Sequence, residues 1–450
     1  MILEKVILGI DIGSSKICSL IAEIKDGVPH IIGMGIQPAQ GIRKGTITNI
    51  EQASKSIRES VNDAKRIAGV NISQAIISIS GSYTKSINSN AITNNSNKEI
   101  GIQEINRAMN TALYNADIPN NYEMLHTLPY SFKVDGGEYV DNPFGMNGAR
   151  LDVSTHIIAA QKNGLENLKK AVRNAGIEVS DVVLNAYASS IAVLTNEEKE
   201  LGVACIDMGA SSCDIMIHYG NAMRYNYSLG VGSAHITKDI GTVLNITLTT
   251  AEELKRKHIT LYDLTPEDIY SVLEIPSENK SIQLETLHGV VTSRVSETLM
   301  LIEEIIEHSG LRNNLGAGIV ITGGMASMKG LAEIALNIFK GLPVRIASPK
   351  DINGSFDILD PSYSTAIGLI LYGSGKYTNY ELDANKKLRY SNQSKTTDSS
   401  KSYDPKDSND LSDLKIIKDE ETKVEKEKID IKLKKNTATE KIVEWLKNLF

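Results

Sequence analysis

The sequence predicts an α/β fold built from two similar domains that face each other. Three observations support this prediction. A strand–turn–strand hairpin with an Asp-x-Gly turn occurs at Val6–Leu20 and again far downstream at Leu201–Ile217. Apolar strands alternate with amphipathic helices around both hairpins, as in the layers of an α/β domain. A third stretch, Ala317–Ser327, is a β-branched strand that ends in two glycines, where open α/β sheets bind ligands.

The first hairpin, VILGIDIGSSKICSL, carries groups that suit a phosphorylated ligand. Its first strand is apolar, a glycine opens the turn, and a second strand follows. Such a turn can direct backbone N–H groups, two hydroxyls and an ammonium at phosphate oxygens, while the aspartate that ends the strand holds a hydrated cation. The candidate residues are Asp11, Gly13, Ser14, Ser15 and Lys16. A single Asp-x-Gly turn is more often a plain hairpin, so the interpretation depends on the second copy.

Composition excludes several classes of protein. The chain has 450 residues, enough for two or three domains, with an ordinary hydrophobic content of 41%. A net charge of -7 and an aromatic content of 5% argue against a nucleic-acid binder. The three cysteines, Cys18, Cys205 and Cys213, form no CxxC pair and are expected to be small buried hydrophobes in a reducing compartment. We expect no signal peptide and no membrane-spanning helix, because no long apolar run occurs.

The first 83 residues predict one α/β layer. A short strand at Pro29–Met34 follows the hairpin. Ile50–Ala68 is predicted to be helical because apolar residues recur at three- and four-residue steps. Ala75–Ser80 is a buried strand that Gly81 closes.

Residues from about Tyr83 to Gln161 differ in pattern and predict a small α+β insert. Its expected parts are a polar, turn-rich stretch at Asn88–Asn97, a helix at Gln103–Asn115, a strand at Tyr130–Val134, a loop at Asp141–Leu151 and a strand at Val153–Ala160.

The α/β pattern then returns with a helix at Asn163–Ala175 and a strand at Val179–Asn185. Ala186–Leu194 is a helix of small residues, which is either a crossing point between the two halves or an ordinary alanine-rich core helix.

The second hairpin, LGVACIDMGASSCDIMI, matches the first in its chemistry. Asp207 occupies the place of Asp11, and Gly209 occupies the place of Gly13. Two such hairpins indicate two similar domains, between which the phosphates of a nucleotide would be held from both sides.

The region after the second hairpin supplies candidates for the rest of a nucleotide. The charged stretch Thr250–Lys257 is either a solvated helix face or a source of contacts to a ribose and base. Leu287–His308 is a long amphipathic helix, and Ser364–Gly373 is a second helix of small residues. Glycines at the end of the Ala317–Ser327 strand leave bare backbone that can lie against a purine or ribose.

From about Lys376 the composition changes again. Residues 391–436 are rich in Ser, Asn, Thr and charges of both signs, which predicts a disordered linker. The last fourteen residues, TATEKIVEWLKNLF, predict an amphipathic helix that lies in a membrane surface, or else docks on its own domain or on a partner. Its apolar arc consists of Ile442, Val443, Trp445, Leu446, Leu449 and Phe450. One such helix binds weakly, so stable attachment requires many copies.

Taken together, these motifs resemble the signatures of the actin/Hsp70/sugar-kinase ATPase superfamily. The two phosphate loops would be Ile10–Lys16 and Ile206–Asp214, the adenosine loop Ile321–Ala326, and the connecting helices Ala186–Ile191 and Thr365–Leu369.

Within that superfamily the chain closely resembles the FtsA family of bacterial cell-division proteins. The loop at Asn142–Leu151 is similar to the family pattern Asn-Pro-x-Gly-x-x-Gly-x-Arg-Leu. Other similar stretches are the insert, Arg43–Ile47, Leu194–Val203, Gly318–Gly330, Tyr363–Gly373 and the terminal helix. The resemblance covers residues 1–375 and the last fourteen residues, but not the linker.

The resemblance implies an α/β, actin-like two-domain ATPase fold with subdomains 1A, 1C, 2A and 2B, followed by a disordered C-terminal linker and a terminal amphipathic helix. The expected boundaries are 1–83 and 163–195 for 1A, 84–162 for the 1C insert, 196–242 and 316–375 for 2A, 243–315 for 2B, 376–436 for the linker and 437–450 for the membrane-targeting helix.

The function that the resemblance implies is a structural one. The family binds ATP with Mg²⁺, self-associates into filaments on the cytoplasmic side of the inner membrane at the division septum, and recruits the tubulin-like FtsZ ring. Subdomain 2B would hold the C-terminal peptide of FtsZ, later division proteins would engage 1C, and the terminal helix would bind an anionic membrane surface as a peripheral anchor.

The resemblance also assigns roles to single residues. Gly13, Ser14, Ser15 and Lys16 would hold phosphates, Asp11 and Asp207 would orient Mg²⁺ through water, and Gly209, Ala210, Ser211 and Ser212 would close the second loop. Glu252, Lys255 and Arg256 would meet the ribose and base, Gly323, Gly324 and Met325 would line the adenosine pocket, and Arg294 is the candidate contact for the acidic FtsZ tail.

Two departures concern hydrolysis. The family's second loop usually has three glycines and a threonine, whereas this chain has Gly209-Ala210-Ser211-Ser212-Cys213, with side chains where bare backbone would approach a phosphate. Asn185 stands where an acid or amide often opens the first connecting helix, and an asparagine can orient water but cannot take its proton. We therefore expect ATP binding with weak or absent ATPase activity, and assign no catalytic residue.

Two alternatives share the fold. A small-molecule kinase would need a positioned carboxylate base and leaves the insert and the tail without a role. A type IV pilus assembly ATPase also works at the membrane with a peptide partner, but the Asn142–Leu151 loop and the terminal helix speak against it.

Overall fold

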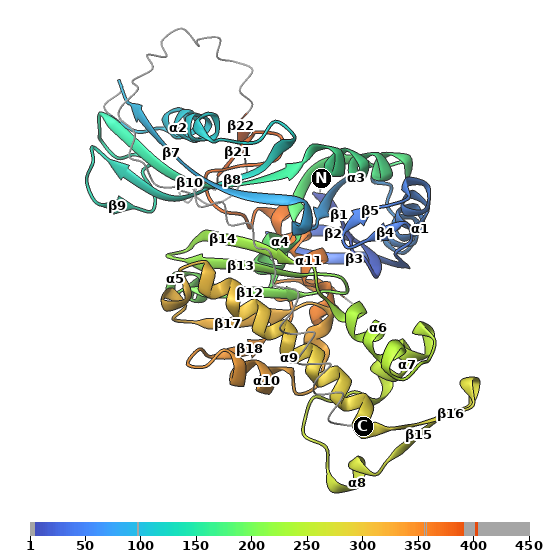
Figure 1. Cartoon of the computed structure of the whole chain (residues 1–450). Coiled ribbons are helices and arrows are strands. Elements are labelled where there is room, and N and C mark those ends of the chain that lie inside the picture. The colour runs from blue at the N-terminus through green and yellow to red at the C-terminus, as the bar shows by residue number, and fades with distance from the viewer. Residues whose placement is uncertain (1–4, 97–98, 355, 357, 391–400, 404–450) are drawn as a thin grey trace. The chain divides into compact units, whose positions relative to one another are not determined.

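The computed structural model describes residues 5–96, 99–354, 356, 358–390 and 401–403. These residues belong to one unit, residues 1–403, and are organised around three sheets (Figure 1). We call the sheets, with the helices that cover them, lobe 1, the insert and lobe 2. The terminal segment 404–450 lies outside the described residues, and so does the apolar arc predicted there.

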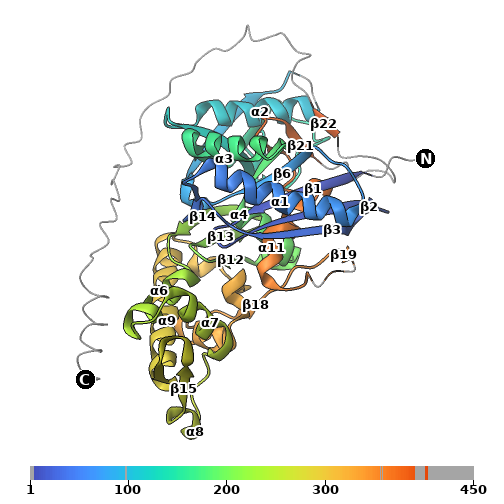
Figure 2. The same ribbon diagram turned by 90° about the vertical axis from the view of Figure 1, so that its right-hand side faces the viewer.

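Lobe 1 contains the first hairpin. Its sheet has the order β11 (Glu178–Leu184), β6 (Gln74–Ile79), β1 (Val6–Ile12), β2 (Lys16–Lys25), β3 (Val28–Pro38) and β19 (Asn353–Gly354), and a separate short pair is formed by β4 (Ile42–Arg43) and β5 (Thr46–Ile47). β1 pairs antiparallel with β2 through the glycine turn and parallel with β6. The helices α1 (Ile50–Ala68) and α3 (Lys162–Asn174) lie side by side on this lobe (Figure 2). The helix predicted over Ile50–Ala68 is confirmed, with an Asn49 cap and a left-handed glycine at its end.

The insert is a mixed layer of long strands and one helix. Its sheet has the order β22 (Lys401–Tyr403), β21 (Leu388–Tyr390), β20 (Glu381–Leu382), β8 (Tyr122–Val134), β10 (Arg150–Gln161) and β7 (Thr84–Asn94), with β9 (Tyr139–Val140) beside β8. The helix α2 (Ile102–Asn115) packs against β7 and β10.

Two expectations for these segments are wrong. The polar stretch Asn88–Asn97 is mostly strand β7, because its residues up to Asn94 pair with β10. Ala91 of this strand is buried in the core of the insert. The linker does not begin at 376: residues 376–390 are packed, and their strands β20 and β21 extend the insert sheet. Leu382 and Leu388 are buried there. The segment is polar on average, but these two apolar side chains pack it into the core of the insert.

Lobe 2 contains the second hairpin. Its sheet has the order β14 (Ala222–Leu229), β13 (Cys213–Tyr219), β12 (Val203–Met208), β17 (Gly318–Thr322) and β18 (Val344–Ile346). Its helices are α5 (Asn196–Leu201), α6 (Ser233–Val243), α7 (Leu248–His258), α8 (Pro266–Ile269), α9 (Leu284–His308) and α10 (Leu331–Ile338), and a hairpin is formed by β15 (Val272–Ile275) and β16 (Lys280–Gln283). None of the helices in the described part of the chain is both long and apolar enough to cross a membrane.

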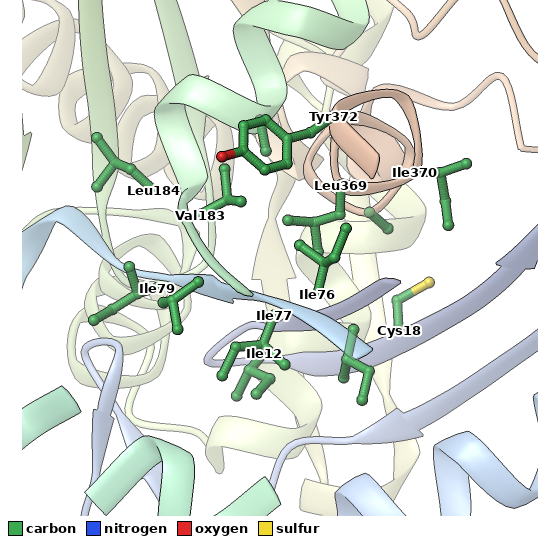
Figure 3. Close-up of a cluster of buried hydrophobic side chains, with 14 of the residues drawn as sticks. Ile12, Cys18, Ile76, Ile77, Ile79, Val183, Leu184, Leu369, Ile370 and Tyr372 are labelled. Carbon is green, nitrogen blue, oxygen red and sulfur yellow. The ribbon is translucent and has the colours of Figure 1, made fainter. Parts of the chain in front are cut away.

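Two helices join the lobes. α4 (Asn185–Val193) packs against β12 and β13 of lobe 2 and against β11 and β6 of lobe 1, and α11 (Ser364–Ser374) packs against β1 and β2 of lobe 1. They contact each other so closely that a Cβ on Gly368 would lie 1.9 Å from the carbonyl oxygen of Ala188. The side chains of α11 gather with those of the lobe 1 strands in a hydrophobic core (Figure 3), which continues to Cys205 and Met216 of lobe 2. The two small-residue helices are therefore the crossing point between the halves.

Candidate functional site

A cavity of about 520 Å³ lies between the lobes, where both Asp-x-Gly turns meet. Its volume is in the range of about 300–1,000 Å³ that is typical of small-molecule sites. All predicted nucleotide-binding residues line it: Asp11, Gly13, Ser14, Ser15, Lys16, Asp207, Gly209, Ala210, Ser211, Ser212, Glu252, Lys255, Arg256, Gly323, Gly324 and Met325. Residues from distant segments of the chain thus converge on one space.

The lobe 1 turn is closed by its own backbone. The Gly13 N–H donates to the Lys16 carbonyl at 3.1 Å, and a Cβ on Gly13 would lie 2.8 Å from that oxygen, so glycine is required. The Gly45 N–H, from the β4–β5 turn, donates to Ser14 Oγ at 2.8 Å and fixes that hydroxyl. The N–H groups of Ser14 and Ser15 donate to no acceptor in the described part of the chain, which leaves them available to an anion.

Lys16 reaches across the cavity. Its Nζ donates to Ser362 Oγ at 2.9 Å and lies 3.8 Å from the centre of the Tyr363 ring. The cation–π contact and the hydrogen bond hold the ammonium in place at the cavity.

The lobe 2 turn repeats the closure of the first. The Gly209 N–H donates to the Ser212 carbonyl at 2.9 Å. The start of α6 is hydrogen-bonded to the turn, because the N–H groups of Ser233 and Ala234 donate to the carbonyls of Gly209 and Ala210. Both turns therefore have the same hydrogen-bonded shape, and Ala210 and Ser211 of the second occupy the places of Ser14 and Ser15 of the first.

Two aspartates, the buried Asp11 and the half-buried Asp207, face the cavity from opposite lobes. Ser78 Oγ donates to Asp11 Oδ1 at 3.0 Å, and Ser189 and Thr365 donate to Asp207 Oδ2, the latter at 3.0 Å. Burial raises the pKa of Asp11 to about 6, with a contribution from Asp207, and burial also raises the pKa of Asp207. A cation between the carboxylates would offset this cost.

The donor set fits Mg²⁺. Within the described ranges, no group of three or more His, Cys, Asp or Glu side chains is placed to hold a metal. A cation at Asp11 and Asp207 would therefore take its other ligands from water and phosphate. Mg²⁺ is usually bound in this way, through one or two carboxylates with retained waters.

The far end of the cavity is lined by α7. Glu252 forms ion pairs with Lys255 at 2.6 Å and Arg256 at 2.8 Å, and accepts a hydrogen bond from Thr237. Lys255 is nearly buried, so this part of the charged stretch is more than a solvated face. Gly323 also lines the cavity, with φ +88, and a Cβ there would lie 2.3 Å from Asp207 Oδ1.

Several cavity residues were not predicted from the sequence. Asp214 lines the cavity, accepts a hydrogen bond from Ser228 at 2.5 Å, and has a pKa that burial raises to about 7. The partners of Asp207, Ser189 and Thr365, lie on the two small-residue helices. Hydroxyls within such helices are the signal that could have found them.

Asn185 lines the cavity too, at the start of α4. Its Oδ1 is buried and has no hydrogen-bond partner among the described residues, which suits a site that receives a water or ligand.

Arg294 lies on α9, away from the cavity lining. It forms ion pairs with Asp239, at 2.5 Å, and with Glu297. Its contact with an acidic peptide stays a prediction, and such a peptide would have to compete with both carboxylates.

Comparison with known proteins gives matches of two kinds. The family model described as "Cell division protein FtsA" matches residues 204–368, and the model described as "SHS2 domain inserted in FTSA" matches residues 81–159. The cell division protein FtsA of Helicobacter pylori strain J99 is 40% identical over 422 residues, covering 86% of this chain and 85% of that protein. The Escherichia coli K12 protein of the same description is 31% identical over 399 residues, covering 86% and 94%.

Among solved structures, the PilM-PilN type IV pilus biogenesis complex aligns with a TM-score of 0.60 at 16% identity. The alignment covers 82% of this chain and 98% of that one. At this identity the likeness concerns the fold alone.

Proposed function

This chain belongs to the FtsA family of cell division proteins and has an actin-like fold, and from this premise we propose that it binds ATP with Mg²⁺, polymerises on the inner membrane and tethers the FtsZ ring there. The observation that carries the proposal is the convergence of both Asp-x-Gly turns on one cavity. The alternatives of a small-molecule kinase and a pilus assembly ATPase lose support, because the relatives at 40% and 31% identity are cell division proteins, and because the likeness to the pilus complex is one of fold only.

Each part of the cavity has a task in this proposal. The free N–H groups and hydroxyls of the two turns and the Lys16 ammonium bind the phosphates. Asp11 and Asp207 orient the hydrated Mg²⁺, which neutralises phosphate charge when bound. Glu252, Lys255 and Arg256 bind the ribose and base, and the backbone at Gly323, Gly324 and Met325 lines the same pocket.

ATP serves as an assembly ligand in this account. A nucleotide that contacts both lobes favours the lobe arrangement that filaments require. Hydrolysis is proposed to be weak or absent. Asn185 can orient a water but cannot accept its proton, and Ala210, Ser211 and Ser212 add side chains to the tip of the second turn.

The remaining functions are proposed from the family. The division into subdomains 1A, 1C, 2A and 2B assigns the FtsZ C-terminal peptide to 2B, near Arg294, and later division proteins to the 1C insert. The apolar arc of the terminal helix anchors the chain peripherally to the cytoplasmic face of the inner membrane at the septum, and a filament sums many weak anchors.

Nucleotide binding is tested with a fluorescent ATP analogue and the variant Lys16→Met. The variant loses the ammonium but keeps most of the side chain, and its affinity for ATP should fall about 10- to 100-fold, as expected for one hydrogen-bonded charge. Lys55→Met, at an exposed position on α1 of the same lobe, is the matched control and should bind as the wild type does. Equal affinity of the wild type and Lys16→Met would refute the proposed site.

Membrane attachment is tested by co-sedimentation with anionic liposomes, ATP and the FtsZ tail peptide. Deletion of residues 437–450, or Trp445→Glu, should leave the protein in the supernatant while ATP binding survives. The wild type should pellet and carry the peptide with it. If the variants pellet as the wild type does, the terminal helix is not the anchor.

A further inference from the structure

Glu381, on β20, is a buried carboxylate outside the nucleotide cavity. It has no exposed surface, and it lies in the segment that leads from α11 toward the C-terminal tail. A carboxylate at this depth requires hydrogen bonds. Two tyrosine hydroxyls supply them: Tyr187 donates to Oε2 and Tyr372 donates to Oε1, each at 2.6 Å.

The two tyrosines come from the two connecting helices. Tyr187 is on α4, which packs against β12 and β13 of lobe 2 and against β11 and β6 of lobe 1. Tyr372 is on α11, which packs against β1 and β2 of lobe 1. Figure 3 shows Tyr372 extending from α11 above the core of lobe 1. A single carboxylate therefore joins the two connecting helices.

The same two helices are joined again at the cavity. Ser189 of α4 and Thr365 of α11 both donate to Asp207 Oδ2, and their hydroxyls lie 2.9 Å apart. Thr365 precedes Tyr372 by two turns of α11, about 10 Å along the helix. The backbone contact at Gly368 lies between them. The helices α4 and α11 are thus held together at Asp207, next to the cavity, and at Glu381, next to the segment that leads to the tail.

The surroundings of Glu381 hold the segment in place. The Thr378 N–H donates to the Tyr187 hydroxyl at 2.7 Å, and His126 Nδ1 lies 3.5 Å from Glu381 Oε1. Arg389 of β21 pairs with Asp383 and with Asp181 of lobe 1, and its guanidinium lies 4.6 Å from the centre of the Tyr372 ring. Residues 376–390 therefore contact both connecting helices through polar groups as well as through the insert sheet.

We propose that Glu381 is a positioning residue that fixes the packing of α4 on α11, and so the angle between the lobes, and that it couples the cavity to the segment leading to the tail. One carboxylate can accept both tyrosine hydroxyls only over a narrow range of helix positions, so it favours one lobe arrangement. The second part of this proposal, the coupling of the cavity to residues 376–390, rests on the proposed function, because it requires a nucleotide that changes the lobe angle. Opening of the lobes then weakens the hold on residues 376–390.

The test measures the distance between spin labels on the two lobes of the full chain without nucleotide. Labels at Asn62→Cys on α1 and Lys238→Cys on α6 report the lobe angle, and the native cysteines are buried and so resist labelling. Tyr187→Phe and Tyr372→Phe each remove one hydrogen bond to Glu381 and keep the ring. Each should shift the ratio between the lobe arrangement seen in this structure and a more open one about tenfold. This is the effect of losing one hydrogen bond to a charged acceptor.

Tyr380→Phe is the matched control. It removes a tyrosine hydroxyl from the same segment, but that hydroxyl donates to Asn142 Oδ1 of the insert at 2.6 Å, and within the described residues it has no hydrogen bond to either connecting helix. Its distance distribution should equal that of the wild type. Wild-type distributions in both Tyr187→Phe and Tyr372→Phe would overturn the proposal.

A second arm adds MgATP and follows hydrogen exchange in residues 376–390, with binding measured by calorimetry on the same samples. Exchange should change in the wild type and become insensitive to MgATP in Tyr372→Phe. Bound MgATP without a change in the wild type overturns the coupling. Absence of MgATP binding refutes the proposed function instead, and the nucleotide-free distances still decide the role of Glu381.

Discussion

Asp11 is a binding-site residue whose charged form lowers the stability of the ligand-free fold. Its carboxylate is buried with Ser78 as a hydrogen-bond donor, and burial raises its pKa from 3.8 to about 6. As pH rises from about 4 to about 6, the unfolded chain releases this proton and the folded chain keeps it. The free energy of unfolding therefore falls through this window and stays lower above it.

The variant Asp11→Asn removes this ionisation. At pH 8 it should raise the free energy of unfolding of the ligand-free protein by about 2–3 kcal/mol, since one pKa unit corresponds to about 1.4 kcal/mol. The gain should vanish at pH 4, and Mg²⁺-dependent ATP binding should weaken. Urea unfolding at both pH values measures the effect, with Asp26→Asn in an exposed turn as control. A loss of stability at pH 8 would contradict this account of Asp11.

The sequence predicts residues whose chemistry is local. Asp11, Gly13 and Lys16 lie within one hairpin, so their types and spacing are enough to indicate an anion and cation site. Thr365 could not be assigned in the same way, because it meets Asp207 across 158 residues. Partners that only the tertiary fold brings together leave no spacing to recognise.

At the scale of elements, the long amphipathic helices and buried strands were predictable because their periodicity is set by their own residues. The strands β7, β20 and β21 were not. β7 is polar on its solvent face, and β20 and β21 are only two and three residues long. Such strands form because a neighbouring strand supplies their hydrogen bonds, and the β-propensity of their own residues does not indicate which strand that is.

The packed segment 376–390 leads to a prediction about where the folded unit ends. A chain cut after Gly375 loses the buried Leu382 and Leu388 and should be less stable by about 3–6 kcal/mol, from about 1.5–3 kcal/mol for each leucine. A chain cut after Tyr403 keeps both leucines and also β22, which pairs with β21, and should match the full chain. Denaturant unfolding compares the three chains. Equal stability of the two truncated chains would show that β20 and β21 contribute nothing.

At the scale of the whole molecule, the two lobes are related by the repeated hairpin and joined by α4 and α11. The repeat indicated two facing domains from sequence alone, and the structure brings both turns to one cavity. The Asp207 and Glu381 contacts lie at the joint between the lobes. A ligand that bridges the cavity therefore acts on the contacts that set the lobe angle.

The most direct test of this account is hydrogen exchange of the full chain as MgATP is added. The turns at residues 11–16 and 207–212, one from each lobe, should become protected together over the same range of ATP concentration, along with 252–256 and 323–325. Protection of one turn without the other, or of neither, would contradict the claim that the nucleotide is held between the two lobes.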